Sequence, residues 1–368
     1  AIFFGHIGDR KGRKVTMYAS LLMMGISTSI IGILPPAASA GVGVVIVLQL
    51  MRLAQCFGRG GTWGGGILMA YENVPENKRS FYAAIPQIGL PIGFGLSSIL
   101  IAVPTLLLPE DIFFTWGWRI PFLAAIILTL IVIRQKGEMM ETEDYKKAQA
   151  KLEAEEAEGK KHKVGFIPMV KGYWKTLLLG CGTRWVDGTF YNIFIVWILS
   201  YCINWLGMPL IQTYIITIIA CIFKIPFTLF GGWCAQKLGN TRTFVIGALA
   251  SAVLSIPTLK VIELSKGNLA ITIIGIVLGC SIAYNLIWAV ISSLWSSYFE
   301  TEVRYSGISF VYHVPSFLVA GMVPTICTLL INYGKGDTIY VGIYSTVVAL
   351  ISAACALALK ARHDRGEK

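Results

Sequence analysis

The sequence has few charged residues for a chain of 368 residues. Asp, Glu, Lys and Arg make up 14% of it, against about 25% in typical soluble domains, while hydrophobic residues make up 55%. The apolar residues gather in repeated stretches of about 20 or more, the length that an α-helix needs to cross a lipid bilayer. This composition excludes a water-soluble domain and predicts a protein with many membrane-spanning helices.

The sequence also lacks the residue patterns of metal, disulfide and enzyme active sites. Its eight cysteines lie within or at the ends of apolar segments and form neither paired spacings nor a CxxC pattern. Cysteines in such positions act as small packing residues. No cluster of His, Asp and Glu and no nucleophile pattern stands out. We therefore expect no enzymatic activity, no metal ion and no cofactor.

Positive charge is in excess, with 31 Lys and Arg against 20 Asp and Glu, which gives a formal net charge of +11. Most of the bases fall in alternate loops, on one side of the predicted membrane. This asymmetry follows the positive-inside rule, which places these loops and the C-terminus in the cytoplasm. The charge therefore sets the orientation of the chain and does not indicate a nucleic-acid partner. Contact of the loop bases with anionic lipid stays open.

Ten complete apolar segments follow the end of a truncated one near Ile7. They cover residues 15–34, 42–71, 81–103, 117–135, 173–203, 210–234, 241–262, 268–297, 304–332 and 337–360. The polar stretch 136–170, rich in Ala, Glu and Lys, separates them into two groups. We predict an N-terminal half over 1–135, a cytoplasmic central loop over 136–172 and a C-terminal half with a cytoplasmic tail over 173–368. Two groups of six would require a first helix and most of a second before Ala1, so we expect an N-terminally truncated chain.

Residues 5–14, with the sequence GHIGDRKGRK, form a basic run near the start of the chain. Glycines, one acid and several bases between apolar stretches are typical of a tight cytoplasmic loop. We expect Asp9 to cap a helix N-terminus or to pair with an arginine of a neighbouring loop. A similar run over 231–242 closes the equivalent hairpin of the second group, which indicates weak internal symmetry. The gate residues that we predict are Asp9, Arg10, Arg13 and Arg304.

Several segments of the chain resemble a known family. The run at 5–14 resembles the signature of the major facilitator superfamily. The segments that resemble its metabolite:proton symporter family are 52–55 (RLAQ), 60–66 (GGTWGGG), 71–75 (YENVP), 81–82 (FY), 86–89 (PQIG), 116–122 (WGWRIPF), the spaced set Arg184, Asp187 and Tyr191, and 302–307 (EVRYSG). The resemblance covers essentially the whole chain except 136–170.

The resemblance implies an all-α polytopic membrane protein with the major facilitator fold, built from two six-helix halves in the bacterial inner membrane. Members of the family take up citrate, dicarboxylates, 2-oxoglutarate, shikimate, or the osmolytes proline and betaine, together with protons. Three positions depart from the family pattern: Thr62 stands for the usual Glu, Cys56 for Gly and Arg59 for a small or apolar residue. Since these changes alter the charge of one helix, proton coupling and substrate choice are not carried over directly.

Ionisable side chains inside membrane spans are costly, so each one is a functional candidate. Arg52 and Arg59 lie two helical turns apart on one face, with Gln55 between them. Arg184 and Asp187 share a face early in the seventh helix, where a purely structural ion pair is the alternative. The substrate-binding residues that we predict are Arg52, Gln55, Arg59, Arg184, Tyr191 and Lys224, and the proton-coupling residues are Asp187, Glu72 and His313.

The cations within the spans outnumber the acids, and a cavity with surplus positive charge favours an anion. The sequence therefore predicts a secondary active transporter that carries a small organic anion, such as a di- or tricarboxylate, by alternating access and proton symport. The expected partners are this small molecule, protons and the lipid bilayer, and the proton gradient supplies the energy. Two alternatives stay open: a symporter of a zwitterionic osmolyte such as proline or betaine, and a non-coupled facilitator.

Overall fold

The computed structural model describes residues 2–36, 41–135, 145–147, 149–150, 154 and 166–367. Within these ranges, the description does not include the side chains of residues 2, 6, 9–11, 166–168 and 318. The described residues form helices and connecting turns without any strand. The chain divides into two compact units. The first unit comprises Ala1–Asn73, Leu96–Pro168 and Thr301–Ser309, and the second comprises Val74–Gly95, Met169–Glu300 and Phe310–Lys368.

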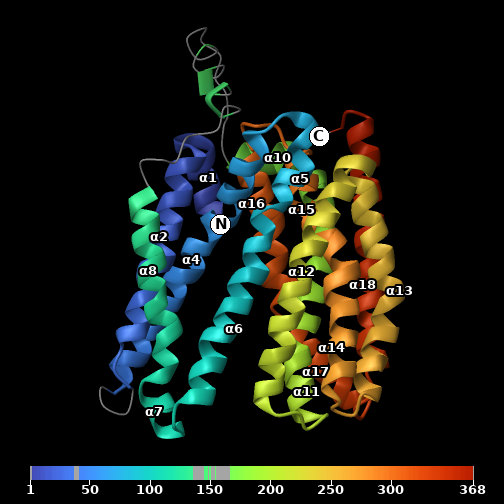
Figure 1. Ribbon diagram of the computed structural model, residues 1–368. Coiled ribbons are helices and arrows are strands. Elements are labelled where there is room, and N and C mark those ends of the chain that lie inside the picture. Colours follow the sequence, from blue (N-terminus) through green and yellow to red (C-terminus); the bar gives the residue numbers. More distant parts are fainter. Residues whose placement is uncertain are drawn as a thin grey trace. The chain divides into compact units, whose positions relative to one another are not determined.

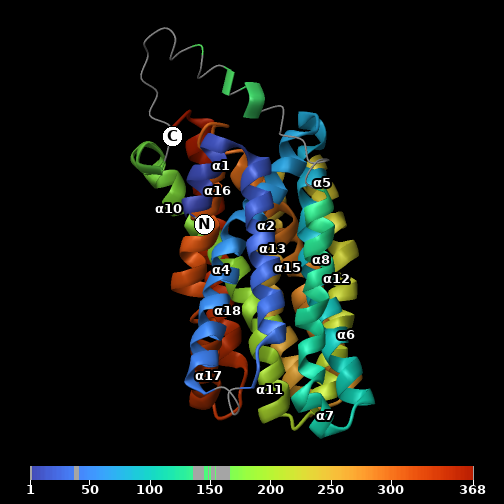
Figure 2. The same ribbon diagram turned by 90° about the vertical axis from the view of Figure 1, so that its left-hand side faces the viewer.

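In the first unit, one helix lies between two others. Its helices are α1 (Ile2–Lys11), α2 (Arg13–Ile33), α4 (Val42–Glu72), the later part of α6 (Gly89–Leu107), α7 (Glu110–Thr115), the 3-10 turn η3 (Gly117–Arg119) and α8 (Ile120–Arg134). Helix α2 packs against both α4 and α8 (Figure 2). The polar residues of α2, such as Ser20 and Ser27, donate hydrogen bonds to its own backbone carbonyls, so they can be buried without an external partner.

The second unit holds most of the C-terminal helices. They are α10 (Phe166–Tyr191), α11 (Ile198–Asn204), α12 (Leu210–Leu238), α13 (Asn240–Leu264), α14 (Leu269–Ile276), α15 (Tyr284–Ser296), the later part of α16 (Arg304–Pro315), α17 (Val323–Tyr333) and α18 (Ile339–Asp364). Figure 1 shows α13 beside the red helix α18, and the two pack along their length.

A short stretch from the N-terminal part of the sequence also belongs to the second unit. It contains the 3-10 turns η1 (Glu76–Lys78) and η2 (Pro86–Ile88), which flank α5 (Arg79–Ala84), and α5 packs on α12 and α15. Gln87 and Trp288 fix this contact reciprocally: Gln87 Nε2 donates to the Trp288 carbonyl and Trp288 Nε1 donates to the Gln87 carbonyl, both at 3.0 Å. The stretch is therefore held by directional bonds as well as by packing.

Nine helical stretches of the described residues are long and apolar enough to cross a membrane. They are Arg13–Ile33, Val42–Glu72, Glu76–Leu107, Gly117–Arg134, Met169–Asn204, Leu210–Leu238, Asn240–Leu264, Leu269–Ser296 and Ile339–Asp364. Each overlaps a predicted segment. The predicted apolar segment 304–332 is divided in the structure, where the chain forms α16, the π-helix η7 (Ser316–Ala320), a turn and α17. Pro315, Gly321 and Pro324 explain the interruption, since proline lacks the N–H that a continuous helix needs.

The basic run near the start is helical rather than a loop. Helix α1 continues through Lys11, and Gly12 alone turns the chain into α2 with φ 98° and ψ 158°. At the end of α12, Gly239 turns the chain into α13 with nearly the same angles, φ 89° and ψ 151°. This region of conformational space is open essentially to glycine only. The predicted similarity of the two runs is thus confirmed at the backbone turn.

Candidate functional site

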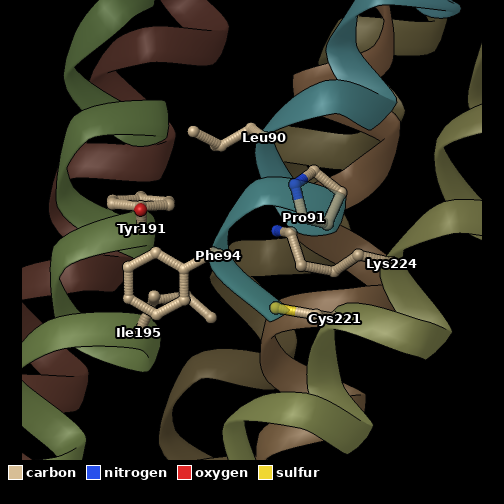
Figure 3. A pocket seen from close by; sticks show the side chains of 7 residues that line it. All are labelled: Leu90, Pro91, Phe94, Tyr191, Ile195, Cys221 and Lys224. Atoms are coloured by element: carbon tan, nitrogen blue, oxygen red, sulfur yellow. The ribbon is translucent and has the colours of Figure 1, made fainter. Parts of the chain in front are cut away.

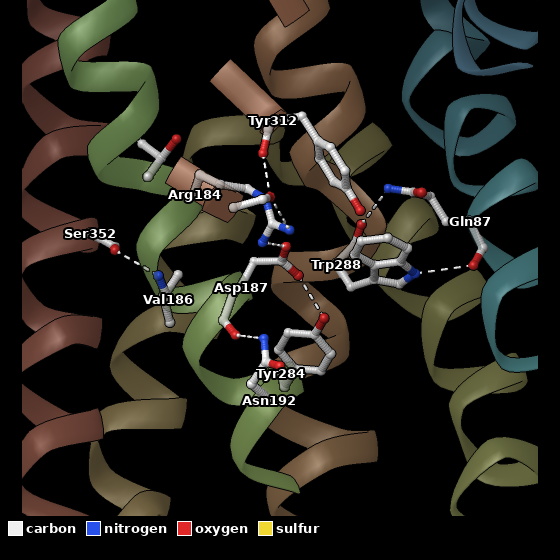
Figure 4. A network of polar contacts seen from close by, with 12 residues as sticks. Gln87, Arg184, Val186, Asp187, Asn192, Tyr284, Trp288, Tyr312 and Ser352 are labelled. Atoms are coloured by element: carbon white, nitrogen blue, oxygen red, sulfur yellow. Dashed lines mark hydrogen bonds and ion pairs between the residues drawn. The ribbon is translucent and has the colours of Figure 1, made fainter. Parts of the chain in front are cut away.

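A buried ion pair lies in the second unit, on α10. Arg184 and Asp187 are three residues apart and pair directly, with 7% and 1% of their surfaces exposed (Figure 4). Arg184 also donates to Ser316 Oγ at 3.2 Å, and its guanidinium carbon lies 4.3 Å from the centroid of the Tyr312 ring. The second oxygen of Asp187 accepts a hydrogen bond from the hydroxyl of Tyr284 at 2.6 Å. The prediction that the two ionisable groups share one helix face is confirmed.

One N–H group of the Arg184 guanidinium is not used in these contacts. Its Nε is buried and has no hydrogen-bond partner among the residues that the structure describes. A buried donor without a partner is unfavourable, so a group that accepts its hydrogen bond would be bound preferentially. A carboxylate is well suited, because guanidinium groups bind carboxylates in a bidentate manner.

Lys224 is a second buried cation of this unit, on α12, with 1% of its surface exposed. Its Nζ lies 3.5 Å from Cys280 Sγ and 4.2 Å from the centroid of the Tyr284 ring. No carboxylate in the described part of the chain forms an ion pair with it. Lys224 lines a small pocket in which the predicted binding residue Tyr191 also lies (Figure 3). The other lining residues are Leu90, Pro91, Phe94, Ile195 and Cys221.

Three π-helices lie next to these side chains. They are η5 (Asn192–Trp197), which follows Tyr191, η6 (Val277–Ala283), which precedes Tyr284, and η7, which begins at Ser316. A π-helix places one extra residue in a turn, and such irregularities are rare and concentrate at functional sites. Their position here supports a site built from Arg184, Asp187, Lys224 and their neighbours.

A second ionic cluster lies in the first unit, where α2, α4 and α16 meet. Glu72 pairs with Arg304 at 3.0 Å and with Arg13 at 3.4 Å, and the side chains of Glu72 and Arg13 are fully buried. Arg13 also donates to the backbone carbonyls of Gly8 at 3.0 Å and Thr301 at 2.9 Å. These bonds tie the start of α2, the end of α4 and the residues before α16 together. Glu72, expected to be a proton-coupling residue, thus contacts two of the predicted gate residues. The side chains of Asp9 and Arg10 lie outside the described residues.

The remaining predicted residues are not part of either cluster. In the first unit, Arg52 and Arg59 are exposed on α4, and the Arg52 guanidinium lies 5.9 Å from the centroid of the Phe122 ring. Gln55 donates to Thr28 Oγ1 on α2 at 2.6 Å. In the second unit, the ring of His313 stands edge-on to that of its neighbour Tyr312.

Sequence reasoning missed Tyr284 and Ser316, which complete the environment of the ion pair. Both are uncharged residues within apolar segments, where tyrosine and serine are common. Only the hydrogen bonds to Asp187 and Arg184 mark them, and these span 97 and 132 residues of sequence. Such contacts leave no signal in local spacing.

Comparison with known proteins identifies the family of this helical chain. Residues 1–324 match the model of the Major Facilitator Superfamily. The chain belongs to the major facilitator superfamily. This confirms the resemblance noted in the sequence, and the relatives of this facilitator are transporters rather than enzymes.

Curated relatives extend over almost the whole chain of this facilitator. The inner membrane metabolite transport protein YhjE of Escherichia coli is 33% identical, over 98% of this chain and 81% of the relative. The shikimate transporter of Escherichia coli is 31% identical, over 98% of this chain and 80% of the relative. The proline/betaine transporter of Salmonella typhimurium is 27% identical, over 99% and 72%.

Solved structures show the same fold. The proton:xylose symporter XylE matches with a TM-score of 0.71 at 16% identity, over 97% of this facilitator and 82% of XylE. The fucose:proton symporter FucP of Escherichia coli matches with a TM-score of 0.66 at 14% identity, over 97% and 86%. The major facilitator fold expected from the sequence is therefore confirmed.

Proposed function

We propose that this facilitator carries a small organic anion together with protons, by alternating access in the bacterial inner membrane. The proton gradient supplies the energy, and no cofactor takes part. Support for the location comes from the 33% identical relative, which is named as an inner membrane protein. Support for symport comes from the proton symporters that share the fold.

The observation that carries the proposal is the burial of Lys224 without an acidic partner among the described residues. A charge removed from water is stabilised only when it is paired and hydrogen-bonded. Cys280 Sγ and the Tyr284 ring are weak partners for an ammonium group. A substrate carboxylate would supply the missing opposite charge.

The balance of charge around the pocket points in the same direction. The buried cluster of the second unit holds two cations, Arg184 and Lys224, against one acid, Asp187. It therefore carries one surplus positive charge when all three are ionised. An anion neutralises this surplus, whereas a zwitterion brings its own positive charge into it.

Asp187 is the proposed proton carrier. Its two oxygens are held by Arg184 and by the Tyr284 hydroxyl. If a substrate carboxylate competes for Arg184, Asp187 loses its counter-charge and a proton can replace it. Substrate and proton would then bind together and leave together, which is the requirement for symport.

Uptake into proteoliposomes tests this proposal. Labelled citrate, 2-oxoglutarate, shikimate and proline are offered with and without an inward proton gradient, and a protonophore is then added. We expect concentrative uptake of at least one of the anions, which the gradient drives and the protonophore abolishes. Lys224→Gln should reduce this uptake at least about tenfold, since a close charge pair is worth more than about 1.4 kcal/mol in a dry site.

The matched control is Lys237→Gln. Lys237 belongs to the same helix, but it is exposed near the end of α12 and lies over the ring of Trp233. Its replacement should leave uptake unchanged. Equal uptake by the Lys224→Gln variant and the unmodified protein would contradict the assignment of the anion site.

A zwitterionic osmolyte is the second candidate substrate, because three of the relatives are named as proline/betaine transporters. Proline uptake without anion uptake in the same assay would favour it. A non-coupled facilitator is the third possibility, and uptake that persists after the proton gradient collapses would favour that mechanism.

A further inference from the structure

Tyr284 stands between the two ionisable sites of the second unit. Its hydroxyl donates to Asp187 at 2.6 Å, and the face of its ring lies 4.2 Å from the ammonium nitrogen of Lys224. The side chain is completely buried. Arg184, Asp187 and Tyr284 are in direct contact (Figure 4). Ser316 on η7 and Lys224 on α12 extend these contacts into one continuous chain across α12, α10, α15 and η7.

The phenol of Tyr284 does more than fill space, because its ring contacts a cation while its hydroxyl donates a hydrogen bond. A cation over the ring face attracts the π electrons and thereby strengthens the hydroxyl as a hydrogen-bond donor. A stronger donor stabilises the ionised form of the carboxylate that accepts from it. The ring of Tyr284 thus lies between the ammonium group of Lys224 and the carboxylate of Asp187.

We propose that Tyr284 is the positioning residue that couples anion binding at Lys224 to proton binding at Asp187. A carboxylate bound by Lys224 neutralises the cation behind the ring, the hydroxyl becomes a weaker donor, and Asp187 takes a proton from the open aqueous side. Release of the anion reverses these steps, and the proton leaves with it. By linkage, each ligand raises the affinity for the other by the same factor. This inference rests on the proposed function and adds the residue that links its two ligands.

The other groups around Asp187 are compatible with this role. Arg184 of α10 faces it directly, and Tyr312 of α16 contacts that arginine. Cys280 of η6 lies beyond Tyr284, next to Lys224. Helix α18 contributes Ser352, which does not titrate and accepts from the backbone of Val186. Arg184 acts on Asp187 by direct pairing, whereas in the proposed relay Lys224 acts through Tyr284.

The relay residues lie where their helices are irregular. Tyr284 follows the π-helix η6 and Ser316 begins the π-helix η7. Lys224 lies two residues before Pro226, inside α12. Helices with such breaks have alternative local arrangements within reach, which a relay needs if its contacts are to change during transport.

A double-mutant cycle tests the proposal without any substrate. The protonation of Asp187 is followed against pH by the infrared carbonyl stretch of its acid form, assigned by its loss in Asp187→Asn. We expect Tyr284→Phe and Lys224→Met each to move the loss of this infrared band to higher pH. If the hydroxyl transmits the charge, Lys224→Met should cause a much smaller shift in the Tyr284→Phe background.

Additive shifts in the two single variants would overturn the proposal, because Lys224 would then act on Asp187 without the hydroxyl. The absence of any shift in either single variant would also overturn it. Tyr201→Phe is the matched control: this buried tyrosine of the same unit donates to the Gly336 carbonyl, and its replacement should leave the titration of Asp187 unchanged. If Tyr284→Phe does not fold, difluorotyrosine at position 284 preserves the shape and strengthens the donor, and it should shift the titration in the opposite direction. Neither result depends on the uptake assay, so failure of the relay and failure of the proposed function are distinguishable.

Discussion

The roles of Arg184, Asp187 and Lys224 in the second unit follow from their burial, because a buried charge is unfavourable unless it is paired and hydrogen-bonded. Arg184 and Asp187 neutralise each other, and Tyr284 and Ser316 complete their hydrogen bonds. Lys224 has only weak partners among the described residues. In the proposed function, this site accepts the one negative charge of a substrate carboxylate.

Replacing Arg184 by alanine should abolish uptake and leave membrane insertion intact. The substitution removes the donors offered to the substrate and leaves Asp187 buried without a cation, a loss of about 3 kcal/mol in comparable pairs. The double variant Arg184→Ala/Asp187→Asn should recover thermal stability but not uptake. The measurements are uptake into proteoliposomes, thermal unfolding and the amount of protein in the membrane fraction.

Arg242→Ala provides the control for this experiment. Arg242 is exposed in the first turn of α13, and its replacement should change neither uptake nor stability. Unchanged uptake in Arg184→Ala would remove that residue from the site and leave the ion pair with a structural role only.

The charged members of the candidate site could be predicted from the sequence, and its uncharged members could not. Arg184, Asp187 and Lys224 stand out because a charge is rare in an apolar span. Tyr284 has no such contrast with its surroundings, and its role comes from contacts between helices far apart in the chain.

At the scale of helices, the cluster of Glu72 joins three elements in the first unit. Arg13 at the start of α2 and Arg304 at the start of α16 both pair with this one carboxylate at the end of α4. Arg13 also reaches the carbonyl of Thr301. From the positive-inside rule we expect these helix ends on the cytoplasmic side. We expect the cluster to act as a gate whose bonds break when that side opens.

Glu72→Gln should loosen these helix ends. Hydrogen bonds between charged groups contribute about 1.5–3 kcal/mol, so amide exchange in residues 8–13 and 301–309 should become at least about tenfold faster. Hydrogen–deuterium exchange with mass spectrometry measures this directly. Glu76→Gln is the control, because Glu76 follows Glu72 by four residues in the sequence, is 90% exposed and, within the described part of the chain, pairs with Arg79 alone, at 3.7 Å. Equal exchange in both variants would contradict the gate.

Hydropathy predicted the membrane helices well, apart from one. Prolines occur both in uninterrupted helices and at the interruption. Pro104, Pro226 and Pro257 lie inside continuous helices. Pro315 and Pro324, by contrast, flank the interruption between α16 and α17. The effect of a proline depends on whether neighbouring groups satisfy the backbone that it frees. The sequence of one segment does not contain that information.

At the scale of the whole molecule, the two compact units differ from the predicted halves by two exchanged segments. Residues 301–309 of the C-terminal half belong to the first unit, and residues 74–95 of the N-terminal half belong to the second. Each exchanged segment carries a polar contact, the Glu72–Arg304 pair in one and the Gln87–Trp288 bonds in the other. If the protein works by the proposed alternating access, we expect contacts of this kind to form and break in each cycle.

Coupled movement of protons and anion can be followed with a pH-sensitive dye inside proteoliposomes. The transported anion is added outside, with the same pH on both sides at the start. We predict that the lumen acidifies as the anion enters, and that Asp187→Asn abolishes this acidification. Anion entry without acidification of the lumen would contradict proton symport.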